Sequence, residues 1–367
     1  MPSLEEIIVD SATAGLDLQA ETGAMPAGHN GPYHDPETPV RNTAHWLVTF
    51  LSAHEHTGDD RFWDAADRAL SYLLGEEARP DDWSFSHRTG DDKDQCNGLI
   101  GQAWTIEALA EAVDAGLRPQ EACNVATEVF LAHPFDEALA LWKRVEPDGS
   151  VLPYDRTFNH QVWFAAAGGL LIDGAGRDAV PSVESQVQRF LERLPELMRL
   201  YDDGVVYHPL RPEWTGGERL SLLRPGKWRL LKNDCFALVR PPSSRRRLRK
   251  KAIGYHSFNL YGLALLKLSY PDHEVWNHVK IERALAVLQT KSYQSQISDN
   301  PYGYPYNPPG FENALALQVF GDRDRIASEW VDRQLQTCYD PESYLMTKCS
   351  EDENTAAARL YEATRII

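Results

Sequence analysis

An asparagine recurs near the start of six apolar helical segments, and this repeat constrains the fold more than any other feature of the sequence. The six residues are Asn42, Asn97, Asn159, Asn259, Asn313 and Asn354. Successive members lie roughly 50 residues apart, except for one step of about 100 residues between Asn159 and Asn259. More charged, amphipathic segments lie between them. Such a period is typical of a closed repeat of helical hairpins.

Apolar residues spaced three to four apart predict the helices of these hairpins. The predicted helical segments are 43–54, 61–74, 98–112, 120–130, 160–172, 183–200, 257–269, 275–289, 311–320, 323–335 and 354–364. The segments that begin with asparagine are apolar on nearly all sides, as expected for helices buried all round, whereas the others keep one polar face. We therefore predict an all-α fold, an (α/α)6 toroid of six hairpins.

Residues 202–251 interrupt the repeat with short β-like or extended runs and several prolines. We interpret this stretch as an insertion within one domain that spans residues 1–367. It is rich in basic residues: Arg224, Lys227, Arg229, Lys232, Arg240, Arg245, Arg246, Arg247, Arg249, Lys250 and Lys251. Either these charges are solvated or in an oligomer contact, or they recruit an anion such as a uronic acid, a sugar phosphate or a lipid-linked phosphate.

The composition excludes several classes of protein. A net charge of −17 argues against broad nucleic-acid binding, because phosphate contacts need clustered Lys and Arg. We expect no transmembrane helix, because no run of about 18 apolar residues occurs. The acidic N-terminus lacks a signal sequence, which favours a cytoplasmic protein. The five cysteines contain no C-x-x-C pair, so we expect reduced thiols and neither a disulfide framework nor a zinc site.

In a toroid the starts of the inner helices surround one mouth of a central cavity, so their polar side chains face a common pocket. The alternative for the asparagines is helix N-capping. Aromatic, Pro-stiffened loops beside these starts favour a carbohydrate ligand. We predict these substrate-binding residues: Arg41, Asp94, Asn97, Asp155, Gln161, Trp163, Tyr304, Tyr306 and Glu353.

Three residues at this mouth are candidates for catalysis. His160 and His256 have the side chain best suited to proton transfer near neutral pH, and Glu312 lies on the same rim. A glycosidase-type pair chosen from Asp94, Asp155, Glu312 and Glu353 is the alternative. No P-loop, GxGxxG, HExxH or zinc-ligand spacing occurs, so we expect no cofactor and no metal.

Several motifs identify a family. NGPYHDPETPVRNTAHWL, NGLIGQAWTIEALAEA, FNHQVWFAAAGGLL, YHSFNLYGLALLKL and GYPYNPPGFENALA resemble the agl-cluster protein Q family of archaeal N-glycosylation loci. The resemblance runs from about residue 30 to residue 364. More distantly, the architecture is similar to six-hairpin glycosidases, N-acylglucosamine 2-epimerases and the helical domain of glucuronyl C5-epimerases.

These distant resemblances imply roles for individual residues. The YHSFN stretch is similar to a Tyr-His helix start of the C5-epimerases, which implies that Tyr255 takes part in proton exchange beside a carboxylate, with His256 next to it. Tyrosines of the segment 302–306, namely Tyr302, Tyr304 and Tyr306, are further candidates. The 2-epimerases use two histidines on inner helices, which would correspond to His160 and His256.

The sequence thus predicts a carbohydrate-active epimerase or isomerase that removes and returns a proton during glycan assembly. His160 or Tyr255 would be the base, and His256 or a tyrosine of 302–306 would return the proton. Arg41 or the basic insertion would hold a carboxylate or phosphate. A glycoside hydrolase or lyase is the second reading, and a non-catalytic glycan-binding or scaffold protein is the third. The expected partner is a sugar, uronic acid or glycan, with or without a phosphate or lipid carrier, and the oligomeric state is open.

Overall fold

The computed structural model describes residues 2–366 except 91, 213–231, 233–240 and 322–323. Part of the predicted basic run lies outside the described residues, namely Arg224, Lys227, Arg229 and Arg240. The remaining ranges cover the predicted helices, except residue 323 at the start of one of them, and every residue that we listed for the site.

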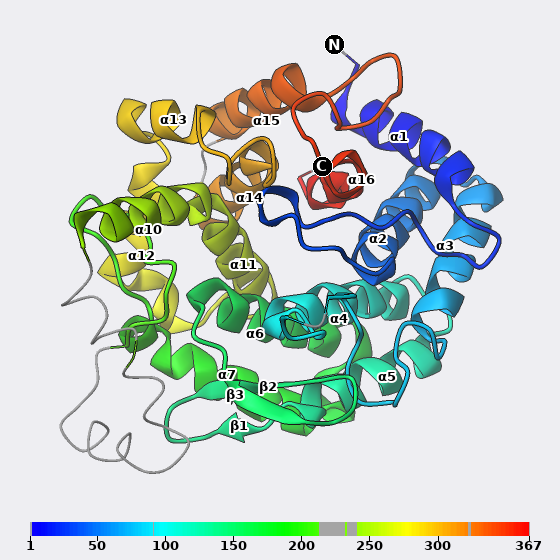
Figure 1. Cartoon of the computed structure of the whole chain (residues 1–367), viewed down its shortest axis with the longest axis horizontal. Helices are drawn as coiled ribbons and strands as arrows, with labels where there is room; N and C mark the ends of the chain where they lie inside the picture. Colours follow the sequence, from blue (N-terminus) through cyan, green and yellow to red (C-terminus); the bar gives the residue numbers. More distant parts are fainter. Residues whose placement is uncertain (1, 91, 213–231, 233–240, 322–323, 367) are drawn as a thin grey trace.

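Within the described residues, the inner ring consists of six helical segments that start at one mouth of the barrel (Figure 1). They are α2 (Val40–Thr57), α4 (Gly98–Asp114), α6 (Phe158–Ala175), α11 (His256–Ser269), α14 (Pro309–Phe320) and α16 (Glu353–Ala358), which a 3-10 helix (Arg359–Ala363) continues. Each packs against the next, and the last packs against α2, so the ring closes. The predicted (α/α)6 toroid is confirmed.

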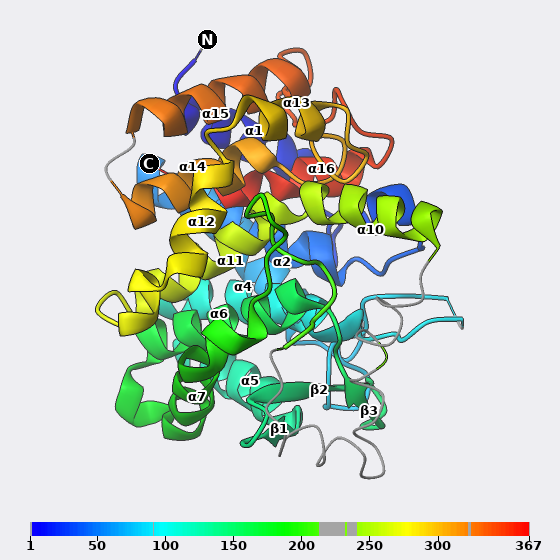
Figure 2. The same ribbon diagram turned by 90° about the vertical axis from the view of Figure 1, so that its left-hand side faces the viewer.

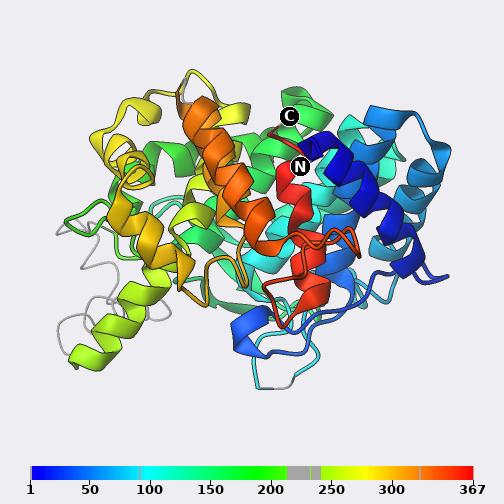
Figure 3. The ribbon, with the colours of Figure 1, turned by 90° about the horizontal axis from the view of Figure 1, so that it is seen from above.

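An outer layer of helices surrounds this ring (Figure 3). It comprises α3 (Asp60–Leu73), α5 (Pro119–Ala132), α7 (Pro181–Leu197), α12 (Val279–Val287), α13 (Lys291–Ser298) and α15 (Asp324–Cys338). The N-terminal helix α1 (Leu4–Leu18) packs on α2 and on the closing 3-10 helix, so the sixth hairpin joins the two ends of the chain. The sequence analysis did not predict α1.

Burial follows the predicted pattern of apolar residues. All but two of the residues of α4 are buried, because its neighbours in the ring and α5 cover every side. Asn97 and Asn42 do not cap their helices through a side-chain hydrogen bond, as the capping alternative predicts. Asn97 is the N-cap residue of α4 but makes no capping hydrogen bond, and Asn42 lies inside α2, where its side chain donates to the Pro26 carbonyl at 2.8 Å.

A small antiparallel sheet lies between α5 and α6, and the sequence analysis did not predict it. The strands are β1 (Phe135–Asp136), β2 (Leu141–Val145) and β3 (Val151–Tyr154), in the order β1-β2-β3. Trp142 is opposite Phe135, and Lys143 is opposite Tyr154. Figure 2 shows β2 and β3 on the same side of the barrel as α10 (Pro242–Gly254).

The prediction of an irregular or β-like insertion at 202–251 is partly wrong. Its last part forms the helix α10, which carries Arg245 to Lys251. In the described residues before it, the extended structure consists of two isolated bridges, from Leu200 to Val206 and from Thr157 to Pro209. The physical reason is that α10 buries only its last turn, so its sequence has no apolar period to reveal a helix.

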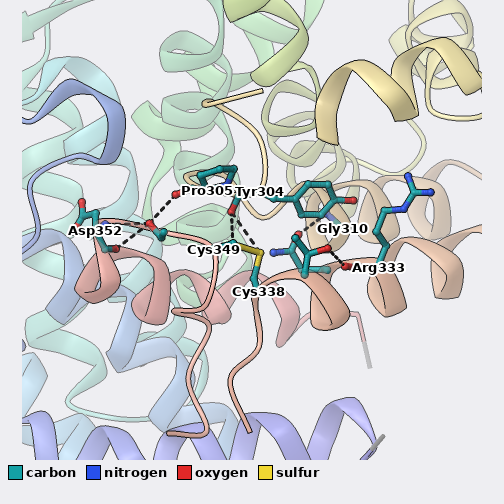
Figure 4. Close-up of a disulfide and its surroundings, with 10 residues drawn as sticks. Tyr304, Pro305, Gly310, Arg333, Cys338, Cys349 and Asp352 are labelled. Atoms are coloured by element: carbon teal, nitrogen blue, oxygen red, sulfur yellow. Dashed lines mark hydrogen bonds between the residues drawn. A yellow bond between two sulfur atoms is a disulfide. The ribbon is translucent and has the colours of Figure 1, made fainter. Parts of the chain in front are cut away.

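The expectation that all cysteines are reduced thiols is also wrong. Cys338, at the end of α15, forms a disulfide with Cys349 (Figure 4). A bridge between Asp340 and Leu345 turns the chain back on itself and brings the two cysteines together. The carbonyl oxygen of Tyr304 lies 3.1 Å from Sγ of Cys349.

None of the helices in the described ranges is long and apolar enough to cross a membrane.

Candidate functional site

A cavity of about 230 Å³ opens at the mouth where the inner helices start. Its wall comes from the loop that precedes α2, the starts of α4 and α6, the segment after α7, the junction of α10 and α11, and the closing 3-10 helix. The lining residues are Asn30, Tyr33, Asp35, Arg88, Lys93, Asn97, Ile100, Trp104, Thr157, His160, His208, Lys251, Tyr255, Phe258, Tyr306, Asn307 and Arg359.

His160 forms a hydrogen-bonded dyad with Asp155 at the edge of this cavity. Oδ2 of Asp155 lies 2.7 Å from Nδ1 of His160 and also accepts from the backbone N–H of Leu99, at 3.1 Å. Burial alone would raise the pKa of Asp155, but the charge and hydrogen bond of His160 outweigh burial and lower it. The carboxylate therefore places the proton of His160 on Nδ1 and leaves Nε2 for proton transfer.

His208 is a second histidine of the cavity wall, and the sequence analysis missed it. Its Nδ1 is buried and has no hydrogen-bond partner among the described residues. Its carbonyl oxygen accepts from the backbone N–H of Phe158 at 3.1 Å, which fixes His208 beside the start of α6. Burial, with the charges of Lys251 and His160, holds the pKa of His208 well below its usual value, so the ring is neutral.

Three tyrosines form another part of the wall, and the ring of Tyr255 lies 4.7 Å from that of His208. The hydroxyls of Tyr33 and Tyr255 lie 2.8 Å apart, and the rings of Tyr255 and Tyr306 are 6.2 Å apart. Burial raises the pKa values of Tyr33 and Tyr255 well above the usual value, so both remain protonated phenols. Nζ of Lys251 lies 4.8 Å from the centre of the Tyr33 ring, within the range of a cation–π contact.

The cavity wall is electropositive, although the whole chain is acidic. Its lining includes four cations, Arg88, Lys93, Lys251 and Arg359, and one carboxylate, Asp35. Asp35 is shared between Lys93, which pairs with it closely, and Arg88, at 3.9 Å. Carboxylates behind the lining also pair with Arg88 and Arg359, so Lys251 is the cation of this wall without a carboxylate partner among the described residues, and an anionic ligand fits its charge.

Two buried donors in the same wall have no partner among the described residues, namely Nδ2 of Asn97 and Nε1 of Trp104. A buried donor without a partner is costly, so a ligand with oxygen acceptors would satisfy both. The wall therefore offers both cations and neutral donors to the oxygens of a bound group.

Of the predicted catalytic and binding residues, His160, Tyr255, Asn97 and Tyr306 line the cavity. Asp155 acts on the cavity through His160, as the dyad shows. The structure therefore brings these five residues together, although they come from different helix starts in the sequence.

Arg41 and Glu312 lie behind the wall rather than in it. The guanidinium of Arg41 stacks 4.2 Å from the Trp104 ring, and its Nη1 donates to Glu37 at 3.3 Å. Glu312 pairs with Arg359 at 3.0 Å and is fully buried. Neither residue lines the cavity, but each contacts a side chain that does.

The structure does not bring His256 to the cavity. Its Nδ1 accepts from the backbone N–H of Val206 at 3.2 Å, and its Nε2 donates to the carbonyl of Ala284 at 3.0 Å. Burial lowers its pKa to about 4, so the buried ring is neutral. Both nitrogens are occupied, and the residue joins the segment before α10 to α12. Its predicted catalytic role is corrected to a structural one.

Gln161 and Trp163 are also structural. The side chain of Gln161 donates to the carbonyl of Trp142 at 3.0 Å and accepts from its N–H at 3.1 Å, which pins β2 to α6. Trp163 donates to the carbonyl of Phe258 at 3.0 Å and stacks on its ring. Both are buried, and neither lines the cavity.

The remaining predicted binding residues lie elsewhere. Asp94 pairs with Arg88 at 2.6 Å and with Arg144, so its carboxylate is occupied beside the cavity rather than in it. Tyr304 lines a separate small cavity next to the disulfide, and Glu353 is exposed at the start of α16. In the part of the chain that the structure describes, no three His, Cys, Asp or Glu residues are grouped to hold a metal ion.

No model of a known protein family matches this sequence. Over 368 residues the chain is 50% identical to archaeal glycosylation protein Q of Haloferax volcanii, and the match covers 100% of this chain and 98% of that protein. The chain belongs to the archaeal glycosylation protein Q family. The resemblance read from the motifs is confirmed, and this member of the protein Q family is a homologue of a glycosylation protein.

The fold is shared with solved structures of low sequence identity. A D-mannose isomerase has a TM-score of 0.62 at 16% identity, covering 98% of this chain and 95% of that chain. Cellobiose 2-epimerase from Bacillus thermoamylovorans has a TM-score of 0.63 at 10% identity, covering 98% of both chains. An inactive variant of an α-1,6-mannanase from Salegentibacter has a TM-score of 0.61 at 10% identity, covering 100% and 99%. At such identities the likeness shows the fold alone.

Proposed function

We propose that this protein Q homologue is an epimerase or isomerase of a sugar that carries a carboxylate, such as a uronic acid, and that it acts in glycan assembly. The observation that carries the proposal is the dyad of Asp155 and His160 at the edge of an electropositive cavity. An aligned base beside cations is suited to removing a proton from a carbon whose neighbour carries negative charge.

The first half of the reaction uses the dyad. Nε2 of His160 takes the proton from the carbon next to the carboxylate, and Asp155 stabilises the imidazolium that forms. The electron pair left by that proton moves onto the carboxylate oxygens as an enolate-like intermediate. The free donors of Asn97 and Trp104 hold these oxygens, and Arg359, whose N–H groups are all bonded within the protein, favours their negative charge through its own charge alone.

In the second half of the reaction, Tyr255 and Tyr33 of the cavity wall return a proton. Tyr255 remains a phenol, because burial raises its pKa well above the usual value, so it has a proton to return from the other face of the sugar. Tyr33 is hydrogen-bonded to it and stabilises the phenolate, with the charge of Lys251 nearby. The proton goes back to the same carbon, from the other face, and gives the inverted configuration.

The family and the fold support this proposal. The relative in Haloferax volcanii is named a glycosylation protein, and the structures with this fold include an isomerase and an epimerase of sugars. Hydrolysis has less support, because a glycosidase needs two carboxylates that flank one bond. Of the four candidates, Asp155 is bound to His160, Asp94 to two arginines and Glu312 to Arg359, and Glu353 is exposed.

Incubation of uronic acids and their glycosides in D2O tests the proposal. Solvent deuterium should appear at a ring carbon with wild-type protein, and His160→Gln and Tyr255→Phe should each slow this exchange by about 100-fold or more. The matched controls His56→Gln and Tyr344→Phe change exposed residues away from the cavity and should exchange like wild type. Release of a new reducing end without exchange would establish a hydrolase instead. Binding with neither reaction would favour the scaffold reading.

A further inference from the structure

The helix α10 carries an unusual concentration of positive charge. Six of the seven residues from Arg245 to Lys251 are basic, and the first turn has no acidic residue. Arg246 and Lys250, and likewise Arg247 and Lys251, are four positions apart, so like charges are neighbours on the helix surface. Cations near the helix N-terminus also oppose its dipole. This arrangement weakens the helix, so helix stability does not explain it.

The helix α10 projects from the rest of the barrel (Figure 3). Its last basic residue, Lys251, lines the cavity. The charges of Arg247 and of Lys93, which comes from a different loop, both act on Lys251. Three cations therefore converge at the mouth from two separate segments of the chain.

The other basic residues of α10 divide into two groups. Arg249 pairs with Asp203 and ties the helix to the segment after α7. Arg246, Arg247 and Lys250 are exposed, and none of them forms an ion pair with a carboxylate of the described residues. Although the chain has an excess of acidic residues, no carboxylate of the described residues neutralises these three cations by an ion pair.

We propose that Arg246, Arg247 and Lys250, together with Lys93, bind the phosphate of a phosphate-linked sugar. This inference rests on the proposed function, since the sugar ring occupies the cavity. The phosphate then lies at the mouth, and the carrier to which it is esterified lies outside the cavity, along α10.

The chemistry of the two regions supports this division. Inside the cavity, two neutral donors without a partner, beside two guanidinium groups that carboxylates already pair with, suit a carboxylate of single charge. A phosphate ester has up to two negative charges and several acceptor oxygens in different directions, so it favours several cations from separate elements. The row from Arg247 to Lys251 spans about 6 Å along the helix axis, which is long enough for one phosphate or a diphosphate.

Inorganic pyrophosphate is a probe that does not depend on the sugar. Its affinity should fall at least tenfold in the triple variant Arg246→Gln/Arg247→Gln/Lys250→Gln. The control Arg61→Gln/Arg325→Gln/Lys291→Gln removes the same charge from exposed residues elsewhere and should bind like wild type. Equal affinity in the two triple variants would overturn the proposal, because the effect would then be one of net charge.

Glucuronic acid and its 1-phosphate extend the test to the sugar. Wild type should bind the phosphate at least tenfold more tightly than the free acid, and the α10 triple variant should lose this preference. A nucleoside-diphosphate sugar in solution and a polyprenyl-phosphate sugar in vesicles distinguish the two sources of the phosphate, and a preference for either one supports the proposal. A preference that survives in the α10 variant overturns it. If deuterium exchange fails while the phosphate preference holds, only the proposed function falls.

Discussion

Replacement of Asp155 by asparagine tests the dyad with almost no change of shape. The carboxylate has three donors to satisfy: Oδ1 accepts from the N–H of Thr157 at 3.0 Å, and Oδ2 accepts from Leu99 and from His160. An asparagine has only one acceptor oxygen, so it cannot accept hydrogen bonds at both of the positions that the carboxylate oxygens occupy. If its amide group faces His160, it donates to Nδ1 and places the histidine proton on Nε2, where the ring can no longer act as a base.

The expected size of the effect follows from this change of tautomer. General acid–base catalysis contributes about 10²- to 10⁴-fold, and Asp155→Asn should slow deuterium exchange by that order. Loss of hydrogen bonds to a charged acceptor costs about 1.5–3 kcal/mol of stability, which leaves a typical domain folded. The rate should therefore fall far more than the folded fraction does.

The assay is deuterium exchange at carbon, followed by NMR across pH, alongside circular dichroism of each variant. The matched control is Asp148→Asn, which makes the same substitution on the exposed turn between β2 and β3. If Asp155→Asn is folded and exchanges within about threefold of wild type, Asp155 does not orient His160, and the proposed mechanism is wrong.

Three further predictions concern stability and are measured by urea unfolding. Reduction of the disulfide, or Cys349→Ser, should lower the free energy of unfolding by about 3 kcal/mol. The control Cys123→Ser, at a free cysteine, should change that free energy little. Equal effects of the two substitutions would contradict a stabilising role of the disulfide. Burial lowers the pKa values of His133 and His256 to about 4, so the unfolded chain, with histidines near 6.5, binds protons that the native state does not. The free energy of unfolding should therefore decline as pH falls from about 6.5 to 4, and a slope that persists in His133→Gln/His256→Gln would assign the decline to other groups. Trp163→Ala should cost about 3–5 kcal/mol because it empties a buried stack, and a cost no larger than that of the exposed Trp83→Ala would refute the assigned packing.

The ring of inner helices was predictable because burial on all sides leaves a long apolar signal in each segment. The elements that the sequence missed lack such a signal. In α10, only Ala252, Ile253 and Gly254 are buried, so its charged sequence has no periodic apolar face. The disulfide depends on the turn between Asp340 and Leu345, which is a feature of the folded loop rather than of cysteine spacing.

For the site, the sequence located helix starts but not the direction in which each side chain points. Tyr255 and His256 are adjacent, yet Tyr255 lines the cavity and His256 faces Val206 and Ala284. Successive residues of a helix are about 100° apart around its axis, so neighbours at a helix start face different surroundings. His208 was missed for another reason, since it comes from the insertion and reaches the cavity only by pairing beside the start of α6.

The charges buried beneath the cavity explain how a barrel with an acidic sequence presents a positive wall. Arg359 donates to Glu312 and Glu362, and all three side chains are almost fully buried. Burial raises the pKa values of both glutamates, and the negative charge of Glu362 raises that of Glu312 further, whereas Arg359 acts to lower both. Both glutamates therefore bind a proton more readily than exposed glutamates do. Ion pairs buried in this way seldom add stability, and every N–H of Arg359 is bonded within the protein, so Arg359 gives the cavity wall its charge but no hydrogen-bond donor.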